Sequence, residues 1–377
     1  MVLEDVCELI ADCPHTTAPD EGKGYPLIRT PNVGKGRLLL EGVHRVSKDI
    51  YDKRNMRAIP HKDDIIFARE APAGNAALIR EGQEVCLGQR TVLIRPDCEK
   101  VFPKYLVYYL LAPEQQYKLL GTANGATVAH VNLPVIRKMP IELPDIDVQQ
   151  KIAGYISIYD DLIENNQKQI KLLEEAAQRL YKEWFIDLRF SGYEETEIID
   201  GVPKDWEKKL IGDIIGKIPR TKQIKTSDYL SEGAIPVVDQ SRDFIAGYTN
   251  DKDSVVNLGI PIIVFGDHTR ILKYIQFPFA KGADGTQLII SDKDNMPQSL
   301  LYLSLKAVDL SNYHYARHFK YLKAEIILVP TQEIGDKFDR IVSPMLNRIQ
   351  KLRDICNKSS QARDRLLPKL LSGEIEV

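Results

Sequence analysis

Apolar residues recur at alternating steps of four and three along one long segment near the middle of the chain. The positions are Ile152, Ile156, Tyr159, Ile163, Asn166, Ile170, Leu173, Ala177, Leu180 and Trp184. Such steps keep every member on one face of an α-helix, as in a coiled-coil seam. The pattern predicts a helix of about 40 residues, which spans about 60 Å. Asn166 either fixes the register of this seam or is only a weak spot in it.

A second seam of the same kind lies near the C-terminus. Its positions are Phe338, Val342, Met345, Ile349, Leu352, Cys356, Ser359, Arg363, Leu366 and Leu370. A long helix must bury its apolar stripe against an element of similar length, so we expect the two helices to form an antiparallel intramolecular coiled coil. Ser359 and Arg363 weaken this seam. Pro344 lacks a backbone donor and predicts a break or kink, and Gly373 predicts the end of the helix.

The two seams belong to a longer internal repeat. Leu143-Pro144 and Val329-Pro330 lie 186 positions apart, and the same offset aligns the apolar positions of both seams. Upstream segments repeat in the same order: Tyr25–Ile28 with Ile235–Val238, Asp64–Phe67 with Ile262–Phe265, Gln89–Ile94 with Asp284–Ile289, and Pro103–Tyr108 with Pro297–Tyr302. Chance likeness explains one such match but not an ordered series.

Short β-type runs broken by Gly, Pro and Asn open each half, and a helical stretch closes it, Lys104–Leu120 in the first half and Gln298–Leu310 in the second. The predicted fold class is therefore α+β, with two mixed α/β domains in a pseudo-repeat joined by the long helices. We expect a first domain at 1–142, a central helix at 143–190, a second domain at 191–328 and a C-terminal helix at 329–377. The polar, acidic linker Ser191–Glu197 marks the change of domain.

Composition and charge exclude some classes of protein function. The 377 residues include 51 Lys and Arg against 53 Asp and Glu, which excludes a histone-like polycation but leaves room for a local basic face. We find no apolar run of membrane-spanning length and no signal-peptide layout after Met1. The five cysteines form no CxxC pair, as expected in a reducing compartment, so we predict a cytoplasmic protein.

Cationic and amide side chains cluster in the predicted loops of both halves. Such side chains contact DNA phosphates and base edges. The candidate DNA-binding residues are Arg29, Thr30, Asn32, Lys35, Arg37, Arg69, Gln89, Arg90 and Asn124 in the first half, and Gln240, Arg242, His268, Arg270, Lys281, Arg317 and Lys320 in the second. Taken singly, each is as well explained as a solvated loop residue. As a set they favour a DNA-binding face.

Motifs of catalysis are missing from the sequence. The segment Pro96–Lys100 has the letters of a nuclease motif at a spacing too compressed for a metal site. We find no phosphate-binding Gly-rich loop, and no Gly-rich nucleotide fingerprint or Asn-Pro-Pro-aromatic tetrapeptide of the kind a methyltransferase carries. We therefore assign no catalytic residue, no metal ligand and no cofactor to this chain.

Several segments together resemble one known family. They are Leu143-Pro144, Gln149–Ile152, Asp160–Asn166, Ala177–Phe185, Arg365–Ile375, Phe67–Glu70 with Gly88–Thr91, and Gly247–Asn250 with Gly282–Thr286. In this order they are similar to the specificity subunits of type I restriction–modification enzymes, over essentially the whole chain. The weak seam of the second helix and the short segment before Leu3 depart from the family pattern.

The resemblance implies a non-catalytic subunit with two target-recognition domains, each reading one part of a split double-stranded DNA target. It implies that the helix pair sets the gap and docks two methyltransferase subunits, and that endonuclease/translocase subunits join the complex. The assembly would methylate adenine and cleave DNA with ATP. S-adenosylmethionine, ATP and magnesium are then implied for the partners. Geometry alone supports a bipartite target, since two halves spaced by tens of Å meet a duplex about a helical turn apart.

Two other interpretations stay open at the level of sequence. One is a cytoplasmic coiled-coil scaffold whose halves bind proteins rather than DNA. The other is a self-sufficient nuclease or methyltransferase, which the lack of catalytic motifs disfavours. Salt-sensitive DNA binding separates the first from a specificity subunit, because phosphate contacts give a steep negative salt dependence.

Overall fold

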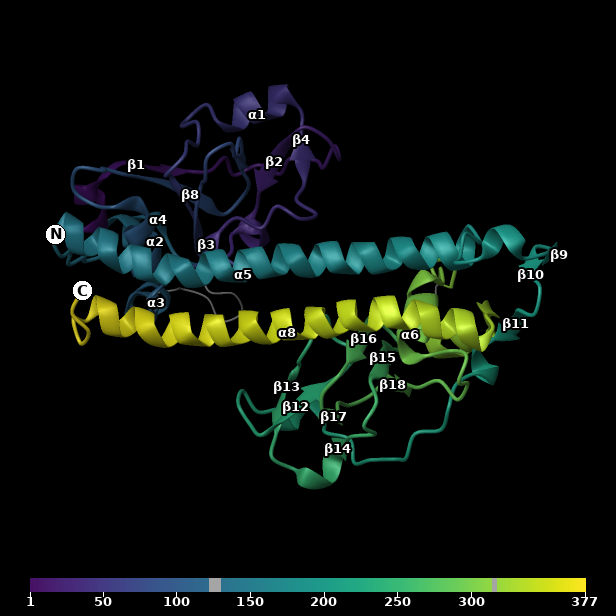
Figure 1. Ribbon diagram of the computed structural model, residues 1–377. Coiled ribbons are helices and arrows are strands. Elements are labelled where there is room, and N and C mark those ends of the chain that lie inside the picture. The colour runs from purple at the N-terminus through teal and green to yellow at the C-terminus, as the bar shows by residue number, and fades with distance from the viewer. Residues whose placement is uncertain (122–129, 314–316) are drawn as a thin grey trace. The chain divides into compact units, whose positions relative to one another are not determined.

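The computed structural model describes residues 1–121, 130–313 and 317–377 (Figure 1). The chain forms two compact units, Met1–Ile163 with Asn357–Val377, and Glu164–Cys356. The long helices α5 (Ile146–Tyr181) and α8 (Gln332–Leu371) each contribute one end to each unit. They begin 186 residues apart, which is the offset of the sequence repeat. The predicted α+β class with a helix pair is confirmed.

The described residues of the first unit form two small sheets and four short α-helices, besides the ends of α5 and α8. Its strands are β1 (Cys7–Asp12), β2 (Tyr25–Ile28), β3 (Gly36–Arg37), β4 (Arg45–Val46), β5 (Ile65–Ala68), β6 (Ala76–Leu78), β7 (Cys86–Leu87) and β8 (Thr91–Pro96). The sheet orders are β1-β8-β5-β6-β3 and β4-β2-β7. Its helices are α1 (Lys48–Arg54), α2 (Pro103–Leu111), α3 (Pro113–Leu120) and α4 (Leu133–Arg137). The predicted single helical stretch Lys104–Leu120 is two helices, because Pro113 forces Ala112 out of the helical region.

The second unit is built from the same kinds of parts. Its strands are β9 (Ile198–Ile199), β10 (Val202–Pro203), β11 (Glu207–Leu210), β12 (Ile235–Val238), β13 (Gly247–Thr249), β14 (Val255–Val256), β15 (Ile262–Gly266), β16 (Leu272–Ile275), β17 (Phe279–Lys281), β18 (Thr286–Ile289) and β19 (Ile326–Val329), and its helices are α6 (Gln298–Ala307) and α7 (His318–Ala324). The sheet orders are β13-β12-β17-β14, β16-β15-β18, β11-β19 and β10-β9.

Strand register shows that the two units repeat one design. Strand β5 pairs antiparallel with β8, with Phe67 opposite Val92, and β15 pairs antiparallel with β18, with Phe265 opposite Gln287. Strand β2 pairs parallel with β7 in the first unit, as β12 does with β17 in the second. The structure therefore aligns residues of the two halves one to one across these strands.

In the first unit, the start of α5 packs on the end of α8. Ile152 and Ile156 share a buried core with Leu367 and Leu370. Arg363 of α8 donates to Asp160 Oδ1 at 2.6 Å, and the Tyr108 hydroxyl donates to Asp160 Oδ2 at 2.6 Å. Arg363, which weakens the apolar seam in sequence, instead forms an ion pair across it.

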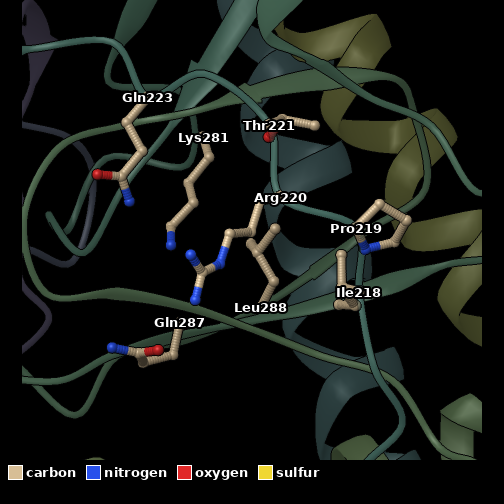
Figure 2. A pocket seen from close by; sticks show the side chains of 8 residues that line it. All are labelled: Ile218, Pro219, Arg220, Thr221, Gln223, Lys281, Gln287 and Leu288. Atoms are coloured by element: carbon tan, nitrogen blue, oxygen red, sulfur yellow. The ribbon is translucent and has the colours of Figure 1, made fainter.

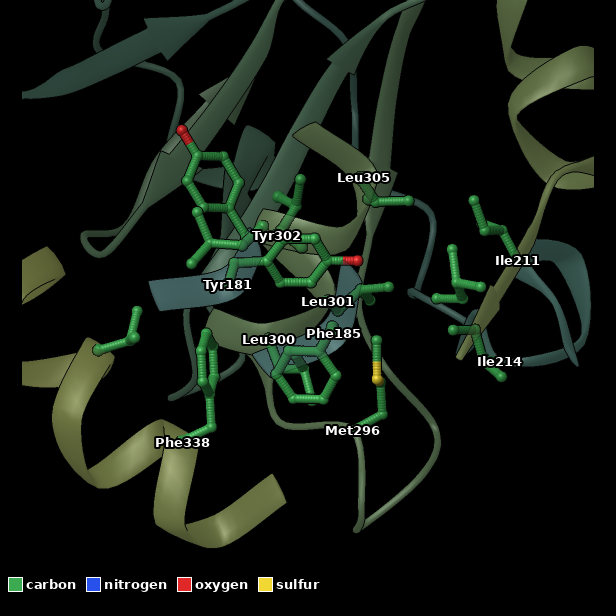
Figure 3. Packing of buried hydrophobic residues seen from close by; sticks show 14 of the residues in the cluster. Tyr181, Phe185, Ile211, Ile214, Met296, Leu300, Leu301, Tyr302, Leu305 and Phe338 are labelled. Carbon is green, nitrogen blue, oxygen red and sulfur yellow. The ribbon is translucent and has the colours of Figure 1, made fainter. Parts of the chain in front are cut away.

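In the second unit, the end of α5 packs on the start of α8. The ring of Phe338 meets that of Phe185 edge-on at 5.0 Å between centroids and also contacts Tyr181 (Figure 3). Trp184, which like Phe185 lies in the π-helical turn Lys182–Ile186 that follows α5, contacts the same ring. Toward the other end of this contact, Arg353 donates to Glu174 Oε1 at 2.7 Å. Residue numbers rise along one helix as they fall along the other, so the pairing is antiparallel, as predicted.

Of the break or kink expected at Pro344, the break is wrong, because α8 is one continuous helix from Gln332 to Leu371. Pro344 removes the bond that its nitrogen would donate to the carbonyl of Arg340, but it lies at an exposed position where water can reach that carbonyl. Val342 and Leu346 on either side are buried in the second unit's core and hold the helix in place. The helix ends at Leu371, and Gly373 follows with a φ of 74°, as the sequence indicates.

Candidate nucleic-acid interface

In each unit, loops that are distant in sequence meet at the same end of the paired strands. Arg69 N donates to Arg90 O at 2.9 Å in the first unit, and Asp267 N donates to Gly285 O at 2.7 Å in the second. Residues 29–32, 69–71, 88–90 and 130 form what we call the first loop cluster. Residues 239–242, 267–270, 282–285, 317 and 318 form the second loop cluster. Each cluster contains most of the candidate DNA-binding residues of its half.

The backbone that holds each cluster together is nearly the same in both units. Gly88 N donates to Ile28 O at 2.7 Å, and Gly282 N donates to Val238 O at 2.9 Å. A β-carbon at Gly88 would lie 2.6 Å from that carbonyl oxygen, which explains the glycine. The Thr91 hydroxyl donates to Gly88 O, as the Thr286 hydroxyl donates to Ala283 O. The scaffold is thus repeated while the side chains it carries differ.

Arg69 lies inside the first loop cluster and holds it together. Only 7% of the residue is exposed, and its guanidinium bonds both carboxylate oxygens of Asp12 at 3.1 Å. It also donates to Val131 O at 2.9 Å and lies 2.9 Å from His130 Nε2. These internal partners use most of its donors, so in this arrangement Arg69 positions the loops.

Arg90 presents the accessible cation of the same cluster. Its backbone is left-handed at a φ of 64°, and its half-exposed side chain pairs with Glu70. Glu70 also lies 2.5 Å from Nδ1 of His130. Burial lowers the pKa of His130, and the positive charges of Arg69 and Arg90 lower it further.

The remaining first-half candidates divide into loop-forming and exposed residues. Asn32 is buried, accepts a bond from Arg29 N at 3.2 Å and donates to Leu39 O. Thr30 donates to Ala71 O, and Gln89 donates to His15 O at 3.1 Å. Lys35 and Arg37 flank Gly36, where an added β-carbon would lie 3.5 Å from Asp160 Oδ2 of helix α5. Asn124 lies outside the described residues.

Gln240 joins the turns of the second loop cluster. Its amide nitrogen donates to Asp284 O at 2.8 Å, and its amide oxygen accepts from His268 N at 3.1 Å. Arg270, left-handed at a φ of 62°, donates to Tyr313 O and to His318 Nε2. Other candidate side chains of the second half are exposed and face solvent. They are Arg242, His268, Arg317 and Lys320.

His318 is a buried titratable group that the candidate set omits. It is 4% exposed, and its backbone nitrogen donates to Asp267 O at 2.9 Å. Burial lowers its pKa, and the neighbouring charge of Arg270 adds to the effect. The first unit has the matching bond from Val131 N to Arg69 O. Equivalent residues of the two units, such as Val131 and His318, can be matched from sequence only once the two halves are aligned through their strands.

Lys281 lies apart from the second loop cluster's hydrogen bonds, in a cavity with Arg220 that the sequence analysis does not predict. Within the described residues, no group of three or more His, Cys, Asp or Glu side chains is placed to hold a metal ion. No helix in the described part of the chain is long and apolar enough to span a membrane. The chemistry that the clusters offer is hydrogen bonding and positive charge.

Comparison with known proteins identifies a matching domain and several similar chains. The type I restriction modification DNA specificity domain matches residues 1–175. The type I restriction enzyme MjaIX specificity subunit of Methanocaldococcus jannaschii is 27% identical over 363 residues, which cover 89% of this chain and 83% of that protein. The HindI specificity subunit of Haemophilus influenzae is 23% identical and covers 83% of this chain and 87% of its own length.

The fold agrees with a solved relative. The crystal structure of the type I restriction–modification S subunit from M. genitalium superposes with a TM-score of 0.58 at 16% identity, over 98% of this chain and 95% of that one. The likeness covers both units and both long helices. Residues 1–175 thus match the type I restriction modification DNA specificity domain, and the chain is similar over most of its length to type I restriction enzyme specificity subunits.

Proposed function

We propose that each loop cluster reads one part of a bipartite double-stranded DNA target. The observation that carries this is one loop scaffold built twice with different side chains. The first cluster presents Gln89 and Arg90, and the second presents Arg242, His268 and Arg317. Since base readout depends on side-chain donors and acceptors, the two half-sites differ in sequence. The relatives' role as specificity subunits supports this assignment over a protein-binding scaffold.

In this proposal the helix pair sets the unread gap and docks two methyltransferase subunits. Both long helices are unbroken in the described structure, as a spacer requires. Large apolar side chains are also exposed on their outer surfaces. Tyr155, Ile158 and Leu162 lie at helical spacing on α5 of the first unit, and Leu172 lies on α5 of the second. Exposed apolar groups at such spacing are typical of a surface that packs on another helix.

In this proposal the chain is the specificity subunit and carries out no catalytic step itself, in keeping with relatives that are named specificity subunits. The adenine methyltransferase and the ATP-dependent endonuclease/translocase subunits would supply the chemistry. S-adenosylmethionine would bind to the former, and ATP and magnesium to the latter. The complex would work in the cytoplasm, where it meets the chromosome.

The test is to map methylated adenines in DNA from cells that express this chain with its neighbouring methyltransferase, against cells that lack only this chain. We expect a split motif with a modified adenine in each part, which disappears when the chain is removed. Methylation that persists without the chain would contradict the proposal and favour the scaffold.

A further inference from the structure

A cavity of about 550 Å³ lies in the second unit between one loop and two strands. Its lining residues are Ile218, Pro219, Arg220, Thr221, Gln223, Lys281, Gln287 and Leu288. The loop is tied down at both ends, since Gly216 N donates to Ile290 O at 2.8 Å and Ile224 N donates to Lys281 O at 3.0 Å. The cavity volume lies within the range of about 300–1,000 Å³ that is typical of ligand sites.

The polar lining of this cavity is cationic. Figure 2 shows the guanidinium of Arg220 and the ammonium of Lys281 pointing into one space, with the amides of Gln223 and Gln287 beside it. None of its eight described lining residues is Asp or Glu. Burial lowers the pKa of Lys281, and among the described residues no carboxylate is found that opposes this shift. A half-buried ammonium without a counterion is costly, and an anion in the cavity would remove that cost.

A third cation, Lys222, lies on the same loop as Arg220 and has a carboxylate partner. Lys222 lies between Arg220 and Gln223 in sequence but pairs with Asp251 at 2.6 Å, and hydrogen bonding to that carboxylate raises its pKa. Within the described residues, no such carboxylate partner is found for Arg220 or Lys281. The two free cations face the cavity, while the paired one does not line it.

The first unit has apolar residues at the matching strand positions. The parallel pair Ile28–Leu87 of β2 and β7 corresponds to Val238–Lys281 of β12 and β17. Val92 likewise corresponds to Gln287, because they lie opposite Phe67 and Phe265. Leu87 is buried in the first unit's core. The corresponding position of the first unit thus holds a leucine, and we expect the second unit to fold with leucine in place of Lys281.

We propose that this cavity binds a phosphate group. Arg220 and Lys281 would hold two of its anionic oxygens through charge-assisted hydrogen bonds, and the amide nitrogens of Gln223 and Gln287 would donate to the others. The phosphate comes either from a DNA backbone or from a free phosphate or nucleotide. The site stands on its lining residues and does not depend on the proposed DNA-reading function.

Isothermal titration of the full chain with inorganic phosphate, at constant ionic strength, tests the site. We expect binding to the wild-type chain and at least a tenfold weaker affinity for Lys281→Leu, which restores the residue of the first unit. Arg220→Gln, on the exposed loop, should weaken binding as well. Lys222→Gln removes the same charge from the same loop and should leave the affinity unchanged.

Titration with a short DNA duplex then separates the two sources. If the phosphate is that of a DNA backbone, inorganic phosphate competes with the duplex, and Lys281→Leu lowers the salt slope of duplex binding by about one. If it is free, duplex binding is the same for both proteins while phosphate binding is lost in the variant. The absence of phosphate binding to the wild-type chain, or equal affinities for wild type, Lys281→Leu and Arg220→Gln, would overturn the proposal.

Discussion

At the scale of single residues, the two arginines of the first loop cluster have opposite roles. Arg69 is buried against Asp12 and the backbone of Val131, whereas Arg90 is half-exposed beside Glu70. Removing one partner of a buried ion pair leaves the other charge uncompensated in a poorly solvated place. An exposed pair contributes little to stability. Substituting each arginine in turn therefore distinguishes an effect on loop stability from an effect on surface charge.

Arg69→Leu should lower the free energy of unfolding by about 3 kcal/mol, because Asp12 loses its counterion and the carbonyl of Val131 loses a donor. Arg90→Gln should cost less than about 1 kcal/mol. Urea unfolding followed by circular dichroism measures both values. Equal losses for the two variants would show that Arg69 does not hold the loops.

Two histidines with lowered pKa values, His130 and His318, make the stability of the folded chain depend on pH, and His318 is the more buried of them. Its pKa is lowered in the folded chain, so the unfolded chain binds a proton first as the pH falls. The contribution of neutral His318 is thus fully present above its unfolded pKa of about 6.5 and is lost as the pH falls below that value. We expect the melting temperature to drop from pH 7 toward pH 5, and to drop less in His318→Gln. Identical pH profiles would contradict this.

At the scale of elements, the long helices depend on their apolar seams. Ile163 is buried and Ile170 packs against the core of the second unit. An aspartate at either place puts a carboxylate into an apolar contact, which costs several kcal/mol or forces the helices apart.

The double variant Ile163→Asp, Ile170→Asp should therefore lose helix pairing and co-purification with the methyltransferase subunits. Gel filtration of the co-expressed proteins measures the loss. Gln178→Asp, at an exposed position of the same helix, serves as the control. An intact complex in the double variant would refute the role of the seam.

The sequence predicts the elements better than the site, for a physical reason. A seam such as Ile152 to Trp184 is a local pattern, and a helix follows from local spacing. The partner of Arg69 is Asp12, 57 residues away, and the cavity of Lys281 requires a loop that pairs with two strands. Such contacts depend on long-range register that no local pattern specifies. Pro344 shows the converse, because tertiary packing overrides a local helix breaker.

At the scale of the whole molecule, the helices are expected to act as a spacer. Adding one heptad to both helices, after Ile163 in α5 and after Cys356 in α8, preserves their seams. The addition lengthens the pair by about 10 Å, or about three base pairs at 3.4 Å each.

We expect the methylated motif of this variant to keep both half-sites and gain about three unread base pairs. A heptad-length insertion into the linker Ser191–Glu197 should leave the gap unchanged. Methylome sequencing compares the two insertions. An unchanged gap after the helix insertions would rule out the spacer role.

The first unit includes the last 21 residues of the chain, Asn357–Val377, together with its N-terminal 163. During synthesis, the segment that completes the second unit therefore leaves the ribosome before the segment that completes the first. We therefore expect the half of the protein that is made first to complete its fold last. A premature stop or a frameshift near the end of the gene would then disrupt the N-terminal half and spare the other half. A mutation in the last codons would thus impair recognition of the half-site that the N-terminal half reads.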